Sequence, residues 1–261
     1  MNYAFMTFST PELTLREVLA AAKTYGYDGI EPRLDVGHRH GIEVAASPRE
    51  RADIRRQVAD SGIALACLAT SLTFADPAKT ETMLRDARDR IGLAGDLGVP
   101  VIRVFGGGIP AGLGREAAIG LVTDSLRRLA DHAAERGVAI AMETHDDWCD
   151  PRHVAAVMRG VAHPAVAVNW DIMHPVRTGR ATIDESFAAL RPWIRHLHIH
   201  DGRGEGGELT PIGTGIINHR RAIELLRGIA YAGFISGEWI NWEDYRVHLP
   251  RELATLKEYD R

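Results

Sequence analysis

The chain has 261 residues, of which 45% are hydrophobic and 25% charged, a composition typical of a globular protein with a sizeable core. Its net charge of −4 argues against a basic nucleic-acid-binding surface, so we expect no nucleic-acid partner. There are only two cysteines, no apolar stretch long enough to span a membrane and no signal-peptide pattern, so we expect a cytoplasmic protein without membrane contact.

Eight short runs rich in β-branched or aromatic residues alternate with longer segments of helical spacing. Each run has the length and composition of a buried β-strand. In chain order the predicted strands are 3–8, 29–34, 63–69, 99–105, 139–145, 165–171, 196–201 and 235–239.

The segments between these strands carry helix signals. Ser47, Pro48 and Glu50 together form an N-cap, a first-turn proline and a capping-box glutamate. Further along, small and apolar residues recur at helical spacing between 118 and 133, and Gly137 follows as a helix stop. We therefore expect a helix after most of the strands.

Strands that alternate with helices are typical of parallel pairing, because each parallel connection needs a crossover. Eight such units predict a (β/α)8 barrel. The main alternative, an open doubly wound sheet, usually has a glycine-rich turn after its first strand, whereas this chain has Phe8-Ser9-Thr10-Pro11 there. No linker or repeat divides the sequence, so we expect one barrel domain over residues 1–261.

Polar side chains capable of chemistry collect at the ends of the last four predicted strands. Barrels carry their active sites at the carboxyl ends of strands, where these residues would meet. Three carboxylates so close together would repel one another unless a divalent cation neutralised them. An oxygen-rich set with one imidazole suits Mn²⁺, Mg²⁺ or Co²⁺. The predicted ligands are Glu143, Asp171, His198 and Glu238.

Further side chains near the strand ends have both functional and structural interpretations. His196, His198 and His200 share one face of their strand. We expect one ligand, one substrate contact and one structural residue that packs or supports the ligands, and His196 is the structural one. His145 is either an additional acid or base or a hydrogen-bond partner of the site. Four further residues could bind substrate hydroxyls or a phosphate, although several of them are expected to be structural: Arg33, His40, Arg103 and Arg177.

The order of these motifs resembles the xylose isomerase-like barrels, which include sugar isomerases and epimerases, inosose dehydratases and, more remotely, endonuclease IV. The resemblance covers nearly the whole chain. It is carried by the segments GYDGIE at 26–31, RVFGG at 103–107, ETH at 143–145, DIMH at 171–174, HLHIHD at 196–201, PIGTG at 211–215 and GFISGE at 233–238.

The resemblance implies one divalent metal, with Mn²⁺ expected first, on the four ligands already predicted. It implies that Glu143 and Glu238 also move protons, and that His174 and Arg203 contact the substrate. The predicted activity is isomerisation or epimerisation of a sugar or keto-sugar by proton abstraction next to a carbonyl. The full substrate-binding prediction is His174, Arg203, His200, Arg103 and His40, and the catalytic one is Glu143, Glu238 and His145.

The same first step also fits a second reaction class. If a β-substituent leaves after proton abstraction, the enzyme is a dehydratase or other lyase acting on a keto-sugar, keto-inositol or 3-oxo-glycoside. An endonuclease IV-like enzyme would need three zinc ions and a basic crescent, which the acidic balance disfavours. A scaffold barrel would have no need for the carboxylate cluster. The resemblance leaves a homo-oligomer or a partner subunit open.

Overall fold

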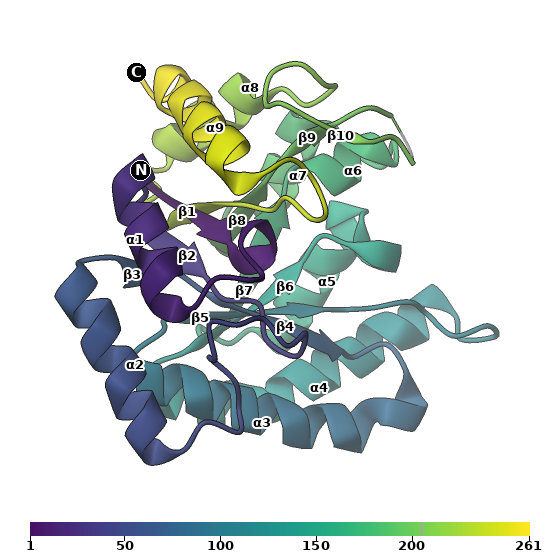
Figure 1. The fold of residues 1–261 in the computed structure, drawn as a ribbon. Helices are drawn as coiled ribbons and strands as arrows, with labels where there is room; N and C mark the ends of the chain where they lie inside the picture. The colour runs from purple at the N-terminus through teal and green to yellow at the C-terminus, as the bar shows by residue number, and fades with distance from the viewer. Residues whose placement is uncertain (205) are drawn as a thin grey trace.

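In the computed structural model, short parallel strands form a central barrel that is surrounded by helices (Figure 1). The structure describes residues 1–204 and 206–261. The barrel strands are β1 (Asn2–Met6), β2 (Gly29–Glu31), β3 (Ala64–Leu65), β4 (Leu68–Thr73), β5 (Val101–Phe105), β6 (Ala139–Glu143), β7 (Val166–Asp171), β8 (Ile194–Ile199) and β11 (Phe234–Gly237). The (β/α)8 barrel predicted from the sequence is confirmed.

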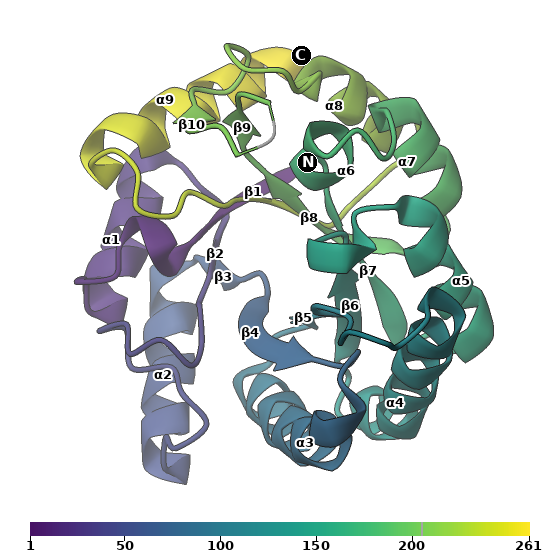
Figure 2. The same cartoon turned by 90° about the vertical axis from the view of Figure 1, so that its right-hand side faces the viewer.

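The helices form the outer layer, which is seen most clearly along the barrel (Figure 2). They are α1 (Leu15–Tyr25), α2 (Pro48–Ser61), α3 (Thr80–Leu97), α4 (Arg115–Glu135), α5 (Pro151–Val161), α6 (Met173–Arg177), α7 (Ile183–Leu190), α8 (His219–Gly228) and α9 (Tyr245–Tyr259). Short 3-10 turns lie at η1 (Thr7–Ser9), η2 (Pro77–Lys79) and η3 (Asp146–Trp148). A small antiparallel hairpin of β9 (Asp201–Gly202) and β10 (Leu209–Thr210) follows β8.

The third predicted strand, 63–69, is divided in the structure into β3 and β4. The sheet order is β3-β2-β1-β11-β8-β7-β6-β5-β4, so β3 pairs with β2 while β4 pairs with β5. Ala69 of β4 is bonded to the segment that follows β2: its backbone N–H donates to the carbonyl of Pro32 at 3.0 Å, and its carbonyl accepts from the N–H of Leu34 at 2.9 Å. These bonds close the barrel, so β3 and β4 together occupy the place of one barrel strand.

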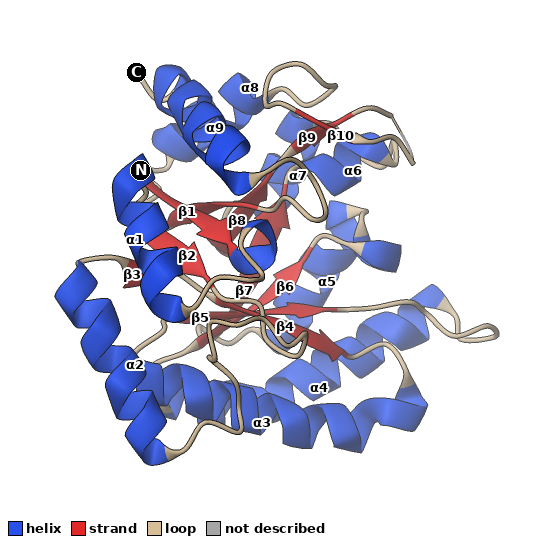
Figure 3. Cartoon of the chain, viewed as in Figure 1, coloured by secondary structure: helices blue, strands red, loops and turns tan. Residues whose placement is uncertain are grey.

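Local sequence explains why helices form on the outside of the barrel. The Ser47 hydroxyl accepts from the backbone N–H of Glu50, and the Glu50 carboxylate accepts from the N–H of Ser47, which completes the predicted capping box of α2. In α4, Val122, Leu126 and Leu129 are fully buried on one face, as the predicted apolar stripe required. Figure 3 shows the strands in the interior of the molecule and the long helices at its periphery.

The register of the strands places the predicted site residues at one level. Glu143 is paired with Asn169, and Asp171 is paired with His198. His198 in turn is paired with Ser236, two residues before Glu238. Neighbouring parallel strands therefore bring the four predicted metal ligands to the same end of the barrel.

The carboxylate of Asp201 organises the loop that follows the β9–β10 hairpin. It is fully buried and accepts hydrogen bonds from the backbone N–H groups of Gly202, Gly213, Gly215 and Ile217. A side chain at Gly215 would collide with this carboxylate and with the backbone carbonyl of Gly202. The glycine is thus needed for a close approach of backbone to side chain.

The two ends of the chain lie close together, because the α-amino group of Met1 is 3.4 Å from the carboxylate of Asp260, the penultimate residue. Within residues 1–204 and 206–261, the helices are either too short or too polar to cross a membrane.

Candidate metal centre

The four predicted metal ligands lie together at the carboxyl end of the barrel. One donor atom from each of the four lies within 4.8 Å of the others. β6, β7 and β8 supply three of them, and the fourth directly follows β11. All are buried: Glu143, Asp171, His198 and Glu238. The structure therefore brings the predicted set of ligands together.

His198 lies at the centre of this cluster. Its Nδ1 is 2.9 Å from Oε1 of Glu143 and 3.2 Å from Oε2 of Glu238. The Asn169 amide also contacts Nδ1, at 3.0 Å. Asn169 was not singled out in the sequence, although it lies two residues before Asp171 on the same face of β7.

Arg103, predicted to bind substrate, lies against one of the predicted ligands. Its Nε is 3.1 Å from Oε2 of Glu143, and both side chains are almost fully buried. The guanidinium also donates to the carbonyl of Thr70 at 2.8 Å and lies 4.0 Å from the centre of the Phe105 ring. These contacts orient Glu143, while substrate contact by Arg103 stays a prediction.

Glu31 belongs to the cluster although the sequence analysis assigned it no role. Nε2 of His196 lies 2.8 Å from its Oε2, and Nε2 of His198 lies 3.1 Å from its Oε1. The signal that could have found it was present, since Glu31 is a carboxylate at the end of β2. Its strand lies next to β1, far in the chain from the four C-terminal strand ends, and only barrel closure brings it to His198.

A second group of histidines lies beside the cluster. Nε2 of His200 is 2.8 Å from Oδ2 of Asp171, and Nε2 of His174 is 3.9 Å from the same oxygen. The rings of His174 and His145 are in contact edge to face, with centroids 4.3 Å apart. Nδ1 of His145 is 2.8 Å from the Asp146 carboxylate. His145 and His174, both partly exposed, are thus placed where a substrate could reach them.

The remaining predicted substrate-binding residues have other surroundings. His40 is buried, and its ring nitrogens contact the carbonyl of Arg33 at 3.3 Å and the N–H of Ile42 at 3.0 Å. Arg203 is exposed next to the β9–β10 hairpin. Arg177 donates to the carbonyl of Gly207 at 2.8 Å. Substrate contacts by His40 and Arg203 stay predictions.

The buried charges alter one another's proton affinity. Burial alone would raise the pKa of Glu238, but the charges of His198 and Arg103 lower it to about 2. Burial also acts to raise the pKa of Asp171, and the facing His200 and His174 hold it well below its usual range. Burial would lower the pKa of His145, yet the bond to Asp146 and the nearby carboxylates raise it to about 9.

The donor set fits a divalent cation. Three carboxylates and one imidazole converge in a buried space, where their repulsion would be relieved by two positive charges. Among the described residues, Oε2 of Glu143 is buried without a hydrogen-bond donor, although Arg103 is near. Buried carboxylate oxygens usually have partners, so this oxygen is available to a ligand.

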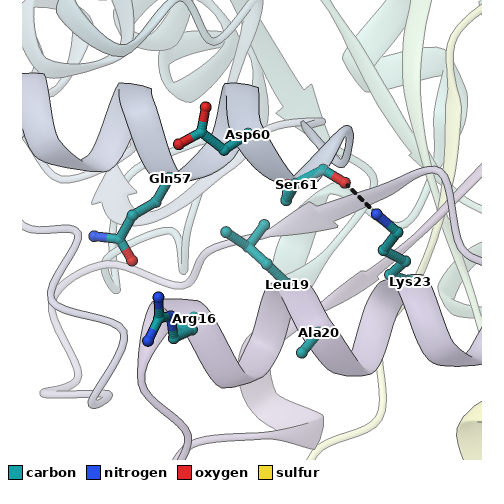
Figure 4. Close-up of a pocket in the computed structure, with 7 residues that line it drawn as sticks. All are labelled: Arg16, Leu19, Ala20, Lys23, Gln57, Asp60 and Ser61. Atoms are coloured by element: carbon teal, nitrogen blue, oxygen red, sulfur yellow. Dashed lines mark hydrogen bonds between the residues drawn. The ribbon is translucent and has the colours of Figure 1, made fainter.

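A pocket on the outside of the barrel is separate from this centre. It lies between α1 and α2 and is lined by Arg16, Leu19, Ala20, Lys23, Gln57, Asp60 and Ser61 (Figure 4). Lys23 crosses it and donates to the carbonyl of Ser61 at 3.4 Å. The pocket contains none of the predicted site residues.

Comparison with known proteins identifies the family of this chain. Residues 19–259 match the model of the family described as xylose isomerase-like TIM barrel. The chain belongs to this family. The resemblance predicted from the sequence motifs is confirmed at the level of the family.

The similar proteins have names that point to different activities. A 3-dehydroshikimate dehydratase from Pseudomonas putida is 28% identical over 228 residues, which cover 76% of this chain and 34% of that protein. The structure of the probable 3-DHS dehydratase AsbF from Bacillus anthracis has a TM-score of 0.82 at 21% identity, covering 98% of this chain and 99% of the other. An IOLI protein with a bound zinc atom has a TM-score of 0.81 at 20% identity, covering 99% and 96%.

The chain spans less than half the length of the curated relatives it matches. At 21% and 20% identity, the two solved structures show a common fold.

Proposed function

We propose that this chain is a divalent-metal-dependent enzyme that removes the proton next to the carbonyl of a polyhydroxylated keto compound. The observation that carries the proposal is the pair of carboxylates, Glu143 and Glu238, that both lie within 3.2 Å of Nδ1 of His198. Two carboxylates near one ion allow one to take a proton while the other returns it. Return at a new carbon gives a sugar isomerase, and return to the opposite face of the same carbon gives an epimerase.

The roles of the chain's own residues follow from their surroundings. Glu143, Asp171, His198 and Glu238 would hold the ion, with Mn²⁺ our first choice. When bound, the ion stabilises the negative charge that develops on the substrate oxygens. Arg103 keeps Glu143 in one orientation.

The base is Glu143 or Glu238, and the proton it accepts comes from the carbon next to the carbonyl. The electron pair of that C–H bond moves into a carbon–carbon double bond, and the carbonyl oxygen becomes negative. Buried surroundings exclude water, which strengthens each of these electrostatic interactions.

A second candidate function is dehydration of the same class of compound, which His145 favours. Its ring contacts that of His174 and is held by Asp146, so that a protonated His145 at the edge of the centre can meet a leaving group. After removal of the α-proton, the enolate re-forms the carbonyl and a double bond forms between the α- and β-carbons, while the bond from the β-carbon to its hydroxyl oxygen breaks. That hydroxyl takes a proton from His145 and departs as water. The dehydratase named among the relatives supports this candidate.

The experiment is deuterium exchange in D₂O. Metal-loaded protein is incubated with ketoses, keto-inositols, 3-oxo-glycosides and 3-dehydroshikimate, and followed by proton NMR. We expect deuterium to enter the carbon next to the carbonyl of one substrate, and exchange to be lost with chelator and in Glu143→Gln and Glu238→Gln. Glu243→Gln, outside the centre, is the control. No exchange from any of these substrates by a metal-loaded protein would contradict the proposal, and the product separates isomerase from dehydratase.

A further inference from the structure

The carboxylate of Glu31 lies between two histidine rings at the base of the cluster. Nε2 of His196 is 2.8 Å from one of its oxygens and Nε2 of His198 is 3.1 Å from the other. All three side chains are at most 1% exposed, so water cannot replace either contact. An ionised carboxylate only accepts hydrogen bonds, and each ring therefore donates its Nε2 proton to Glu31.

This arrangement distinguishes the two nitrogens of His198. Nε2 faces Glu31, whereas Nδ1 faces Glu143 at 2.9 Å and Glu238 at 3.2 Å. A neutral imidazole carries one proton, and a metal-binding nitrogen must have its lone pair free. With the proton held on Nε2 by Glu31, the lone pair is on Nδ1 and points towards the carboxylates of the candidate metal centre.

We propose that Glu31 is a positioning residue of the metal centre, which fixes the ring of His198 in the tautomer whose Nδ1 binds the ion. The inference rests on the proposed function, because it takes the cluster to bind a metal. In many metal sites a carboxylate that accepts the second N–H of a ligand histidine both orients the ring and strengthens its basicity.

His196 completes the arrangement from the other side of Glu31. By donating to Oε2, it prevents the carboxylate from turning away from His198. Glu31, His196 and His198 are also close enough to hold an ion of their own. With the neighbouring centre also occupied, that reading would require His198 to bind an ion through each ring nitrogen, so that Nε2 would lose its proton and its hydrogen bond to Glu31. We therefore infer that the cluster binds one ion, and that Glu31 accepts a hydrogen bond from each of His196 and His198.

The first test is the affinity for zinc, measured by calorimetry with a competing chelator. Metal-free wild-type protein is compared with Glu31→Gln, which keeps the size of the side chain. Its amide has only one oxygen, so it can accept from one histidine ring while its NH₂ group faces the N–H of the other. We expect one zinc ion to bind the wild type and roughly 10- to 100-fold weaker binding by the variant. The matched control is Glu252→Gln. Glu252 is also a fully buried glutamate, but it lies outside the cluster and accepts a hydrogen bond from the backbone N–H of Ile212. Its zinc affinity should equal that of the wild type.

The second test reads the tautomer directly. In ¹⁵N NMR of the zinc-loaded wild type, His198 should show a protonated Nε2 and a metal-bound Nδ1. Glu31→Gln should lose or broaden the Nε2–H signal. If that variant does not fold, His196→Phe provides the readout, because it keeps a ring at this position but leaves Glu31 without its second donor, and it should weaken zinc binding several-fold.

The outcomes separate this inference from the proposed function. One zinc ion bound with equal affinity by wild type and Glu31→Gln, with the same His198 tautomer, would overturn the role of Glu31 and leave the metal centre intact. No zinc bound by the wild type would overturn both. Two ions in the wild type and one in Glu31→Gln would also overturn it, because Glu31 would then be a ligand.

Discussion

Nε of Arg103 lies 3.1 Å from Oε2 of Glu143, and neither side chain is more than 1% exposed. The two residues are neighbours because β5 pairs with β6 in parallel. A buried guanidinium beside a candidate metal ligand serves two purposes, as it partly compensates the carboxylate charge and restricts its rotation. Such pairs are costly to break, since the remaining charge stays buried without its partner.

Replacement of Arg103 should therefore be strongly destabilising. For Arg103→Met in the presence of chelator we expect the free energy of unfolding to fall by roughly 3–5 kcal/mol. Arg128→Met is the control, because the pair of Arg128 with Glu81 is exposed on the helical layer and exposed pairs contribute little. Urea denaturation of both variants measures the difference. Equal losses in the two variants would show that burial of the Arg103 pair has no special importance.

The dehydratase candidate predicts a selective effect of His145. His145→Gln should retain exchange of the α-proton, since Glu143 and Glu238 are unchanged, while water loss slows by roughly 10²- to 10⁴-fold. Exchange and elimination are measured in the same NMR experiment. His153→Gln, a change on α5 away from the centre, should alter neither rate. Parallel loss of both rates in His145→Gln would indicate that this histidine orients the site and does not protonate the leaving group.

The burial of His40 predicts a dependence of stability on pH. Burial and the neighbouring His38 lower the pKa of His40 to about 4, against an ordinary value near 6.5. Between these two values the unfolded chain binds the proton and the folded protein does not, so stability falls as the pH decreases from 6.5 to 4. This histidine alone accounts for roughly 3 kcal/mol over that interval.

The measurement is the free energy of unfolding at pH 7 and pH 4 for wild type and His40→Gln. The variant should lose less stability over this interval, because it has no imidazole to protonate. His132→Gln, which replaces a partly exposed histidine on α4, should show the same pH dependence as the wild type. Identical pH profiles for His40→Gln and wild type would contradict the assigned pKa.

Two glycine-to-alanine changes should have opposite effects on stability. Gly215→Ala places a methyl group against Asp201 and the Gly202 carbonyl, and we expect a loss of about 1–3 kcal/mol from the resulting overpacking. Gly120 lies within α4 with open space around it, so Gly120→Ala should gain about 0.5–1 kcal/mol from helix propensity. Thermal unfolding compares them, and stabilisation by Gly215→Ala would refute the close approach to Asp201.

The sequence was sufficient to predict the fold. Alternating strand and helix patterns recur eight times, and short-range periodicity reports directly which face of each element is buried. The structure differs mainly at 63–69, where one predicted strand is divided into β3 and β4. That division depends on how the barrel closes between Pro32, Leu34 and Ala69, which are not neighbours in the sequence and leave no periodic signal.

The candidate site was predictable only in part. Glu143, Asp171, His198 and Glu238 follow from one rule, that chemistry collects at the carboxyl ends of barrel strands, and strand order alone places them together. The hydrogen-bond partners of these side chains could not be predicted from the sequence. The bonds from Glu31 to His196 and His198 span 165 and 167 residues. Such contacts depend on strand tilt, register and side-chain packing across the closed barrel, which only the tertiary structure decides.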